Sequence, residues 1–162
     1  MSDMPMMLCA PAHATLAEVE KLVKEYNIRA AIHNHGPEDD QFPTPRSVLT
    51  AVGNMDPRLG LCLDIGHTAR AGADILESIR EAGPRLFDIH IKDLKDTSPN
   101  AVQVPVGEGV LPIVPMFGLL RKLNYRGGVM LEYEIDEENP LPGMKQSFAF
   151  MREALAGLAS RL

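Results

Sequence analysis

Short apolar runs alternate along the chain with longer segments in which apolar residues recur every three or four positions. The short runs predict buried parallel strands, because a strand covered on both faces carries few polar residues. The amphipathic segments predict helices that pack on those strands. The predicted strands are residues 6–9, 28–32, 61–64, 86–91 and 129–133.

Helix start and stop signals separate these strands. Thr15 with Glu18 predicts a capping box, Thr44-Pro45 predicts an N-cap with proline at the first helical position, and Asp74 predicts another N-cap. Helices are therefore expected at about 16–26, 45–52, 74–82, 114–124 and 144–158. Asp64 and His67 are expected to enter a loop after their strand, and 94–112 is a long loop of the kind that is usually functional. The alternation predicts an α/β fold built from βαβ units.

Composition narrows the class of protein. The 162 residues, 45% hydrophobic and 23% charged, are ordinary for one soluble domain, taken as residues 1–162. A net charge of −6 argues against nucleic acid as the main partner and suits an enzyme that uses a metal or a small polar substrate. Cys9 and Cys62 lie in apolar runs, which indicates reduced core residues and a cytoplasmic protein. No run is long enough to predict a membrane span.

Potential metal ligands follow four consecutive predicted strands. The carboxyl ends of parallel strands meet on one side of a closed or curved sheet, so these side chains are expected to converge. Imidazoles and carboxylates together suit Mn²⁺, Zn²⁺, Co²⁺ or Fe²⁺ better than Mg²⁺, although the residues alone leave the metal open. The candidates are His33 or His35, Asp64 with His67, His90, and Glu132 or Glu134.

Within each pair the residue nearer the strand is the better fixed, which favours His33 over His35 and Glu132 over Glu134. Each residue alone has an ordinary structural explanation. A strand-end histidine usually makes hydrogen bonds, an aspartate such as Asp64 often caps a turn, and charged side chains are commonly solvated. It is the joint occurrence at four strand ends that predicts one divalent metal site.

Five short motifs carry a resemblance to a known family. They are residues 31–36 (Ala-Ile-His-Asn-His-Gly), 63–67 (Leu-Asp-Ile-Gly-His), 90–93 (His-Ile-Lys-Asp), 106–109 (Val-Gly-Glu-Gly) and 131–134 (Leu-Glu-Tyr-Glu). In this order they resemble the sugar phosphate isomerase/epimerase family, whose fold is a xylose isomerase-like TIM barrel. A complete (β/α)₈ barrel needs about 250 residues. The resemblance therefore implies a partial TIM barrel of about five parallel strands that lacks the first three βα units.

The resemblance also implies roles for the candidate residues. Asp64, His90 and Glu132 correspond to metal ligands of the family, and His33 stands where a glutamate is usual. Glu132 and His33 are then the acid/base candidates. The expected substrate contacts are His35, His67, Arg70, Lys92 and Glu134.

Three functions remain to be weighed. The leading hypothesis is a divalent-metal-dependent isomerase or epimerase that acts on a sugar or sugar phosphate through an enediolate. A phosphodiesterase similar to endonuclease IV is the second, but it would need a basic groove that the acidic balance disfavours. The third is a non-catalytic partial barrel that binds a metabolite or a partner chain.

The expected partial barrel also predicts an assembly. Five βα units cannot close a barrel, so the inner faces of 28–32 and 61–63 should lie partly open. The chain is then a fragment, a domain that needs a partner chain, or a homodimer or larger oligomer that completes the sheet. We expect the oligomer, with no nucleic acid or membrane partner.

Overall fold

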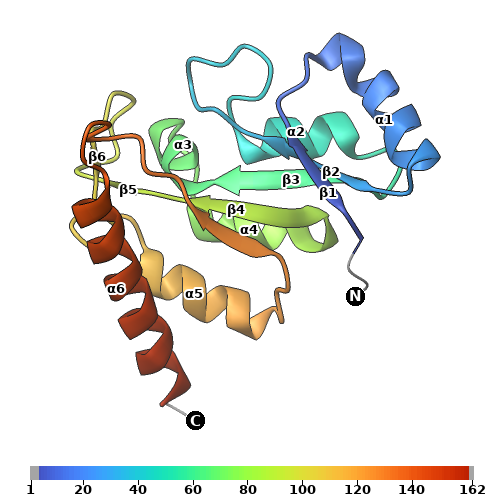
Figure 1. The fold of residues 1–162 in the computed structure, drawn as a ribbon. Coiled ribbons are helices and arrows are strands. Elements are labelled where there is room, and N and C mark those ends of the chain that lie inside the picture. Colours follow the sequence, from blue (N-terminus) through green and yellow to red (C-terminus); the bar gives the residue numbers. More distant parts are fainter. Residues whose placement is uncertain (1–3, 161–162) are drawn as a thin grey trace.

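Five parallel strands form one curled sheet in the computed structural model, which describes residues 4–160. Helices cover its outer face, so the architecture is a half-barrel (Figure 1) and confirms the partial TIM barrel. The strand order follows the chain order, as successive βαβ units require. The strands are β1 (Met6–Cys9), β2 (Arg29–His33), β3 (Leu59–Asp64), β4 (Leu86–Ile91) and, at the far edge, β7 (Gly128–Leu131).

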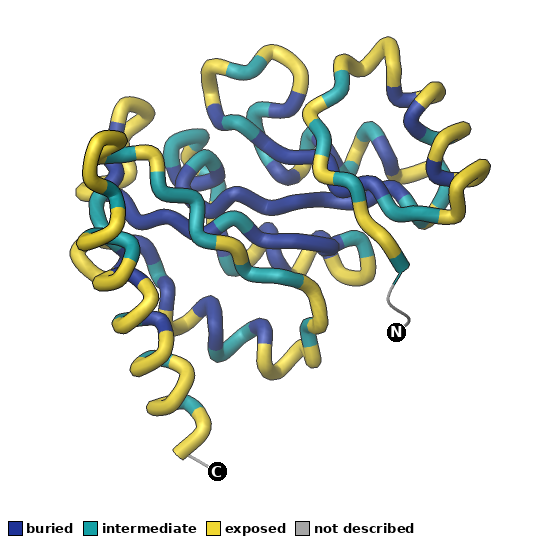
Figure 2. Tube along the Cα trace, viewed as in Figure 1, coloured by how far each residue is buried: buried dark blue, intermediate teal, exposed yellow. Residues whose placement is uncertain are grey.

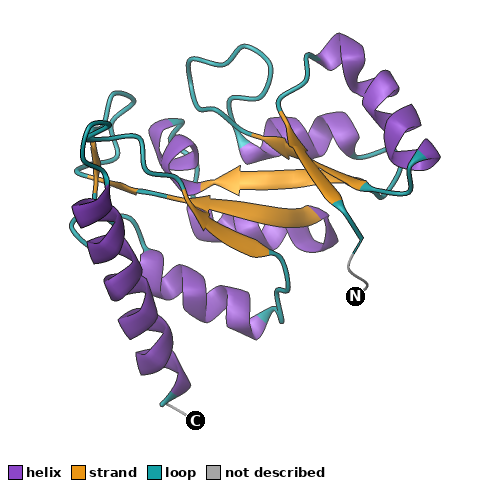
Figure 3. Ribbon diagram, in the orientation of Figure 1, coloured by secondary structure: helices purple, strands orange, loops and turns teal. Residues whose placement is uncertain are grey.

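Helices alternate with the strands of the sheet (Figure 3), and two of the three predicted N-caps begin a helix. The Thr44 hydroxyl accepts from the Ser47 N–H, and the Asp74 carboxylate accepts from the Glu77 N–H, so both residues are N-caps. The helices are α1 (Leu16–Glu25), α2 (Pro45–Val52), α3 (Ile65–Arg70), α4 (Ile75–Ala82), α5 (Ile113–Lys122) and α6 (Leu141–Ala159), with 3₁₀ turns at His13–Thr15 and Gly83–Arg85.

The main apolar core lies between the sheet and the helices on its outer face. Ile32, Leu61, Leu63 and Ile89 point outward from β2, β3 and β4 and have no exposed surface. They pack with buried residues of α2, α4 and α5, among them Ile79. Figure 2 shows this buried centre surrounded by exposed helix surfaces and loops. Burial of the sheet explains why its sequence has few polar residues.

The inner face carries a separate small cluster of Ala31, Cys62 and Phe87. Gly60 makes this packing possible, because a Cβ there would lie 2.5 Å from the Phe87 ring. The prediction that 28–32 and 61–63 lie partly open is wrong for most of these residues, since 30–32 and 61–63 are fully buried. Ala31 and Cys62 pack with the Phe87 ring on the inner face, and the other residues belong to the helix-covered core.

The open apolar positions are instead on the two end strands. Met6 and Leu8 of β1 and Met130 of β7 are all more than a third exposed. Leu8 is the neighbour of Ala31 in the sheet and Met130 is the neighbour of His90, so these side chains share the inner face.

Three local predictions are corrected. Thr15 does not cap α1: it ends a 3₁₀ turn, and its hydroxyl donates to the Ala12 carbonyl oxygen instead. Residues 65–70 form α3 rather than a loop, because the Asp64 carboxylate accepts from the His67 N–H and caps a short helix. The last strand, β7, ends at Leu131, so Glu132 follows it.

The long segment 94–112 is also more ordered than a loop. Its start and middle form an antiparallel pair of short strands, β5 (Asp93–Leu94) and β6 (Gln103–Val104).

The two cysteines are free thiols, Cys62 buried and Cys9 partly exposed. Within residues 4–160, none of the helices has the length and apolar character needed to cross a bilayer.

Candidate metal centre and adjoining cavity

Four predicted ligands meet at the carboxyl end of the sheet. His33 ends β2, Asp64 ends β3, His90 lies near the end of β4, and Glu132 follows β7. One ligand atom from each lies within 4.8 Å of the others. His90 Nδ1 is 3.1 Å from His33 Nε2 and 3.1 Å from the Glu132 carboxylate. The strand ends therefore converge as the sequence predicts.

The buried atoms of this group fit a cation. Asp64 is completely buried, and its Oδ2 has no hydrogen-bond partner within the described chain. The Nδ1 atom of His33 is buried without a partner as well. The Lys92 ammonium, 3.4 Å from this oxygen, compensates part of its charge, and a buried oxygen without a hydrogen bond can still accept a cation as a further partner. Two imidazoles and two carboxylates are a donor set that suits Zn²⁺, Mn²⁺, Co²⁺ or Fe²⁺.

Burial and charge set the protonation of these ligands. Burial raises the pKa of Asp64. Burial also opposes the ionisation of Glu132, but the contacts with His33 and His90 outweigh it and hold the Glu132 pKa below its usual range. Burial likewise opposes protonation of His33, yet the nearby Asp64 and Glu132 carboxylates raise its pKa to about 9. A metal that binds His33 at neutral pH therefore displaces a proton.

A second group of possible ligands, His33, Cys62 and His90, shares two of these residues. Burial is the main cause that raises the pKa of the Cys62 thiol. This group offers three ligand atoms, whereas the set with Asp64 and Glu132 offers four, two of them from carboxylates. The set with Asp64 and Glu132 is the better candidate.

Lys92 places a buried positive charge against the carboxylates. Its side chain has no exposed surface, and its Nζ lies 2.5 Å from Glu134, 3.2 Å from Glu132 and 3.4 Å from Asp64. Burial opposes its charge, but Asp64 and Glu134 outweigh burial and raise the Lys92 pKa, so it remains an ammonium. Gly66 makes room for it, since a Cβ there would lie 2.5 Å from the Lys92 side chain.

Three further predicted residues line one cavity beside the metal group. His35, His67 and Arg70 border a space of about 210 Å³, together with residues 99–101. Burial, helped by the charges of Lys92 and Arg70, lowers the His67 pKa to about 4, so its ring is neutral at physiological pH. His35 contacts Asp39 at 3.2 Å, and Arg70 donates to the Ala101 carbonyl oxygen. Lys92 and Glu134 do not line this cavity; they lie against the metal-group carboxylates.

Sequence reasoning missed three residues that hold the site's backbone. Asn34 is fully buried and accepts from the Asp64 N–H, and Asp93 accepts from several N–H groups of the loop beyond it. Gln103 bonds the backbone of both Glu132 and Glu134. One signal was present in the sequence: Gln103 is a lone polar residue in the apolar run 101–106.

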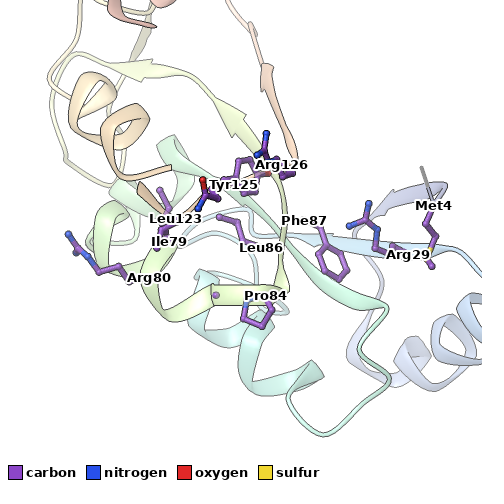
Figure 4. A pocket seen from close by; sticks show the side chains of 13 residues that line it. Met4, Arg29, Ile79, Arg80, Pro84, Leu86, Phe87, Leu123, Tyr125 and Arg126 are labelled. Atoms are coloured by element: carbon purple, nitrogen blue, oxygen red, sulfur yellow. The ribbon is translucent and has the colours of Figure 1, made fainter. Parts of the chain in front are cut away.

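A larger cavity, of about 600 Å³, lies at the opposite end of the sheet (Figure 4). It has three arginines, Arg29, Arg80 and Arg126, and the Arg29 guanidinium stacks 5.1 Å from the centre of the Phe87 ring. The segments that follow α4 and α5 also line it. Arg80 lies in the last turn of α4, where a basic side chain complements the helix carboxyl end, and Arg29 packs on Phe87, so both have a structural explanation. The converging titratable groups place the candidate site at the other end.

Comparison with known proteins agrees with this architecture. The profile of the family described as xylose isomerase-like TIM barrel matches residues 12–154. The chain belongs to this family. Inosose dehydratase from Mesomycoplasma hyopneumoniae (strain 7448) is 28% identical over 157 residues, which cover 84% of this chain and 51% of that protein. The chain thus spans about half the length of the curated relatives it matches.

Solved structures in the family share the fold at low identity. A D-tagatose 3-epimerase-like protein superposes with a TM-score of 0.77 at 20% identity, covering 97% of this chain and 64% of that one. The IolI protein with a binding zinc atom gives a TM-score of 0.76 at 18% identity, with coverages of 97% and 63%. At these identities the likeness establishes the half-barrel alone.

Proposed function

We propose that this chain forms the metal-binding part of a sugar or sugar-phosphate isomerase/epimerase that works by proton transfer through an enediolate. The observation that carries the proposal is the convergence of His33, Asp64, His90 and Glu132 within 4.8 Å. The relatives named above add support, because they include a dehydratase of inosose and an epimerase-like protein.

His33, Asp64, His90 and Glu132 are the residues that would hold one divalent metal ion. When bound, such an ion supplies Lewis-acid polarisation of the substrate oxygens. Glu132 is the proposed base, because it is ionised and its side chain is partly exposed, whereas the Asp64 carboxylate is completely buried. His33 is the candidate for the second proton transfer. Lys92, 3.2 Å from Glu132, provides a fixed positive charge where negative charge develops on the substrate.

The adjoining cavity is the proposed place for the rest of the substrate. His67 is neutral and can both donate to and accept from substrate hydroxyls. His35 and Arg70 lie on its wall and offer further polar contacts, including a charged one for a phosphate group. A substrate phosphate is therefore compatible with the cavity but not required by it.

Dehydration is a second candidate reaction, and one observation favours it. The Glu132 carboxylate, the proposed base, lies 3.2 Å from the Lys92 ammonium, so a proton acceptor and a positive group are paired in the site. That arrangement suits dehydration: Glu132 takes the proton from carbon, the neighbouring C–O bond breaks as a C=C bond forms, and the hydroxyl leaves as water with the proton that Glu132 took up. It also agrees with the similarity to inosose dehydratase. Both reactions begin with the same proton removal by Glu132.

The test is deuterium exchange with Glu132→Gln. The protein, loaded with Mn²⁺ or Co²⁺, is incubated in D₂O with ketohexoses, ketopentose phosphates and inosose, and mass spectra are recorded. We expect wild-type protein to place deuterium in one of them, and the variant to be about 10²–10⁴-fold slower because an amide cannot accept the proton. Loss of 18 mass units from a substrate, the mass of one water, would identify dehydration.

Glu137→Gln is the matched control, since Glu137 is exposed on the loop after β7. It makes the same chemical change outside the site and should exchange at the wild-type rate. Undiminished exchange in a metal-loaded Glu132→Gln protein would exclude Glu132 as the base and leave His33 as the next candidate.

A further inference from the structure

The backbone that carries the two glutamates of the site lacks part of its strand pairing. The last rung between β4 and β7 is the hydrogen bond from the Glu132 N–H to the Ile91 carbonyl oxygen, 3.0 Å. In a continuing parallel ladder, residue 93 would next bond the Glu132 C=O and the Glu134 N–H. Residue 93 is not available for this, because Asp93 begins β5 and pairs with Val104.

The Gln103 side chain occupies that rung. Its Nε2 donates to the Glu132 carbonyl oxygen at 2.6 Å, and its Oε1 accepts from the Glu134 N–H at 3.1 Å. One amide thus makes the pair of bonds, to residues i and i+2, that a neighbouring parallel strand would make. Lys92 contacts the side chains of the same two glutamates. The segment is consequently fixed at both its backbone and its carboxylates.

The amide is itself firmly held. Gln103 is buried, and β6 pairs it with Leu94 of β5. The Asp93 carboxylate anchors the loop beyond the hairpin by accepting from the N–H groups of Gly107, Gly109 and Leu111 at 2.9–3.1 Å. Such a buried amide, bonded through both its Nε2 and its Oε1, has little freedom, so it can define the position of its partners.

Asp64 is held in a similar way on the other side of the site. The Asn34 amide accepts from the Asp64 N–H at 3.0 Å and donates to the Asp64 carbonyl oxygen at 3.4 Å. The backbone of each carboxylate residue in the candidate metal group, Asp64 and Glu132, is therefore hydrogen-bonded to a buried side-chain amide. We propose that Gln103 is a positioning residue that sets where Glu132 and Glu134 stand relative to His90 and Lys92. Its effect on metal binding rests on the proposed function.

The first test needs no metal. Gln103→Met keeps the length of the side chain and removes both hydrogen bonds. Amide hydrogen exchange, followed by NMR on ¹⁵N-labelled protein, should become about fivefold faster at the Glu134 N–H, in line with the loss of one hydrogen bond of about 1 kcal/mol. The Glu132 N–H is an internal control, because it bonds to Ile91 and should keep its wild-type rate.

The second test measures the metal group. Titration with Co²⁺ should give an affinity about 10–100-fold weaker in Gln103→Met, with a shifted visible absorption spectrum, as is usual when a residue behind a ligand is changed. Gln146→Met is the matched control, since Gln146 is an exposed glutamine on α6. A purely structural residue would lower the melting temperature and leave the spectrum of the folded Co²⁺ form unchanged.

The outcomes separate this proposal from the proposed function. Wild-type protein that takes up no Co²⁺ would end the proposed function, while Glu134 exchange would still decide the role of Gln103. Wild-type exchange at Glu134 in the variant, or a wild-type affinity and spectrum when the parent binds Co²⁺, would overturn the proposal. If Gln103→Met does not fold, Gln103→Glu replaces it: it keeps an acceptor for Glu134 and loses the donor to Glu132, so weakened Co²⁺ binding is again expected.

Discussion

The outer and inner faces of the sheet are built from alternate residues of the same strands. Ile32, Leu63 and Ile89 point outward into the helix-covered core, while the residues directly after them, His33, Asp64 and His90, point into the candidate site. The outer face is continuous and apolar. The inner face has a small apolar cluster and, at its carboxyl end, a group of buried charged side chains.

The difference between the two faces shows that neighbouring positions of one strand have different roles. One position packs in the core that stabilises the fold, and the next belongs to the candidate site. Burial of apolar area on the outer face stabilises by about 25 cal/mol per Å². On the inner face, burying Asp64 and Lys92 is costly, and their mutual attraction offsets the cost only in part. The apolar core on the outer face must therefore offset the cost of burying these charged side chains.

The largest expected effect is loss of metal from the inner face. Asp64→Asn should abolish stoichiometric binding of a divalent ion, because it removes an anionic ligand. The amide oxygen can still accept from the His67 N–H, so the cap of α3 is kept. Elemental analysis of protein purified without chelator measures the metal, and thermal unfolding should show stability close to that of the wild type.

Asp74→Asn is the control for that prediction, because Asp74 caps α4 in the same manner away from the site. Full metal content in the Asp64 variant would remove it from the ligand set.

A variant on the outer face should lower stability and leave metal binding unchanged. Ile89→Ala deletes a fully buried side chain of the main core and should cost about 2–5 kcal/mol of unfolding free energy. The folded fraction should still bind metal with the wild-type stoichiometry. Denaturant unfolding measures the loss, with Val114→Ala on the exposed side of α5 as control. A change below 1 kcal/mol would mean that this face contributes less than its burial indicates.

A third, intermediate effect concerns the open end strands. We propose that the chain assembles as a homodimer or larger oligomer, since β1 and β7 end the sheet and expose Met6, Leu8 and Met130. Light scattering at micromolar concentration should give at least twice the mass of one chain, and Leu8→Lys should lower it. A stable wild-type monomer would contradict this assembly.

The smallest effect should come from the amino end of the strands. The Arg58 side chain and N–H lower the Asp56 pKa to about 2, from an ordinary value of 3.8. Because the folded-state pKa is depressed, the contribution to stability is fully present above the ordinary value and is lost as pH falls through the folded one. Asp56→Asn should be slightly less stable than wild type at pH 7, and the gap should close near pH 2. Metal binding should not change.

Measuring unfolding free energies of both proteins from pH 7 to pH 2 tests this. A gap that stays constant with pH would show that the ionic form of Asp56 does not stabilise the fold.

The strands and the four converging side chains could be predicted because both follow from local pattern. The apolar runs at 6–9 and 86–91 match β1 and β4 at both ends. Convergence of His33, Asp64, His90 and Glu132 needs only parallel strands in a curled sheet. Membership of the xylose isomerase-like family could also be recognised from short motifs.

What could not be predicted depends on contacts distant in sequence. The hydrogen bonds between Gln103 and the backbone of Glu132 and Glu134 join residues about thirty positions apart. Hydrophobic periodicity, which predicts helices and strands, does not predict such long-range bonds. The α3 helix was missed because it is short and contains Gly66, and its start depends on the Asp64 cap. The Thr15 capping box failed because the preceding 3₁₀ turn directs the hydroxyl toward Ala12.

The agreement between strand order and chain order has a kinetic consequence. Each βα unit can dock on the edge left by the unit before it, so folding can proceed along the chain with mostly short loops to close. In that order β7 would dock last, and it is also less buried than β2, β3 or β4. Glu132 arrives only with this strand. The rate of metal uptake during refolding would therefore report the rate at which β7 docks. By then β4 would already be in place, and Glu132 would complete the set of four ligands.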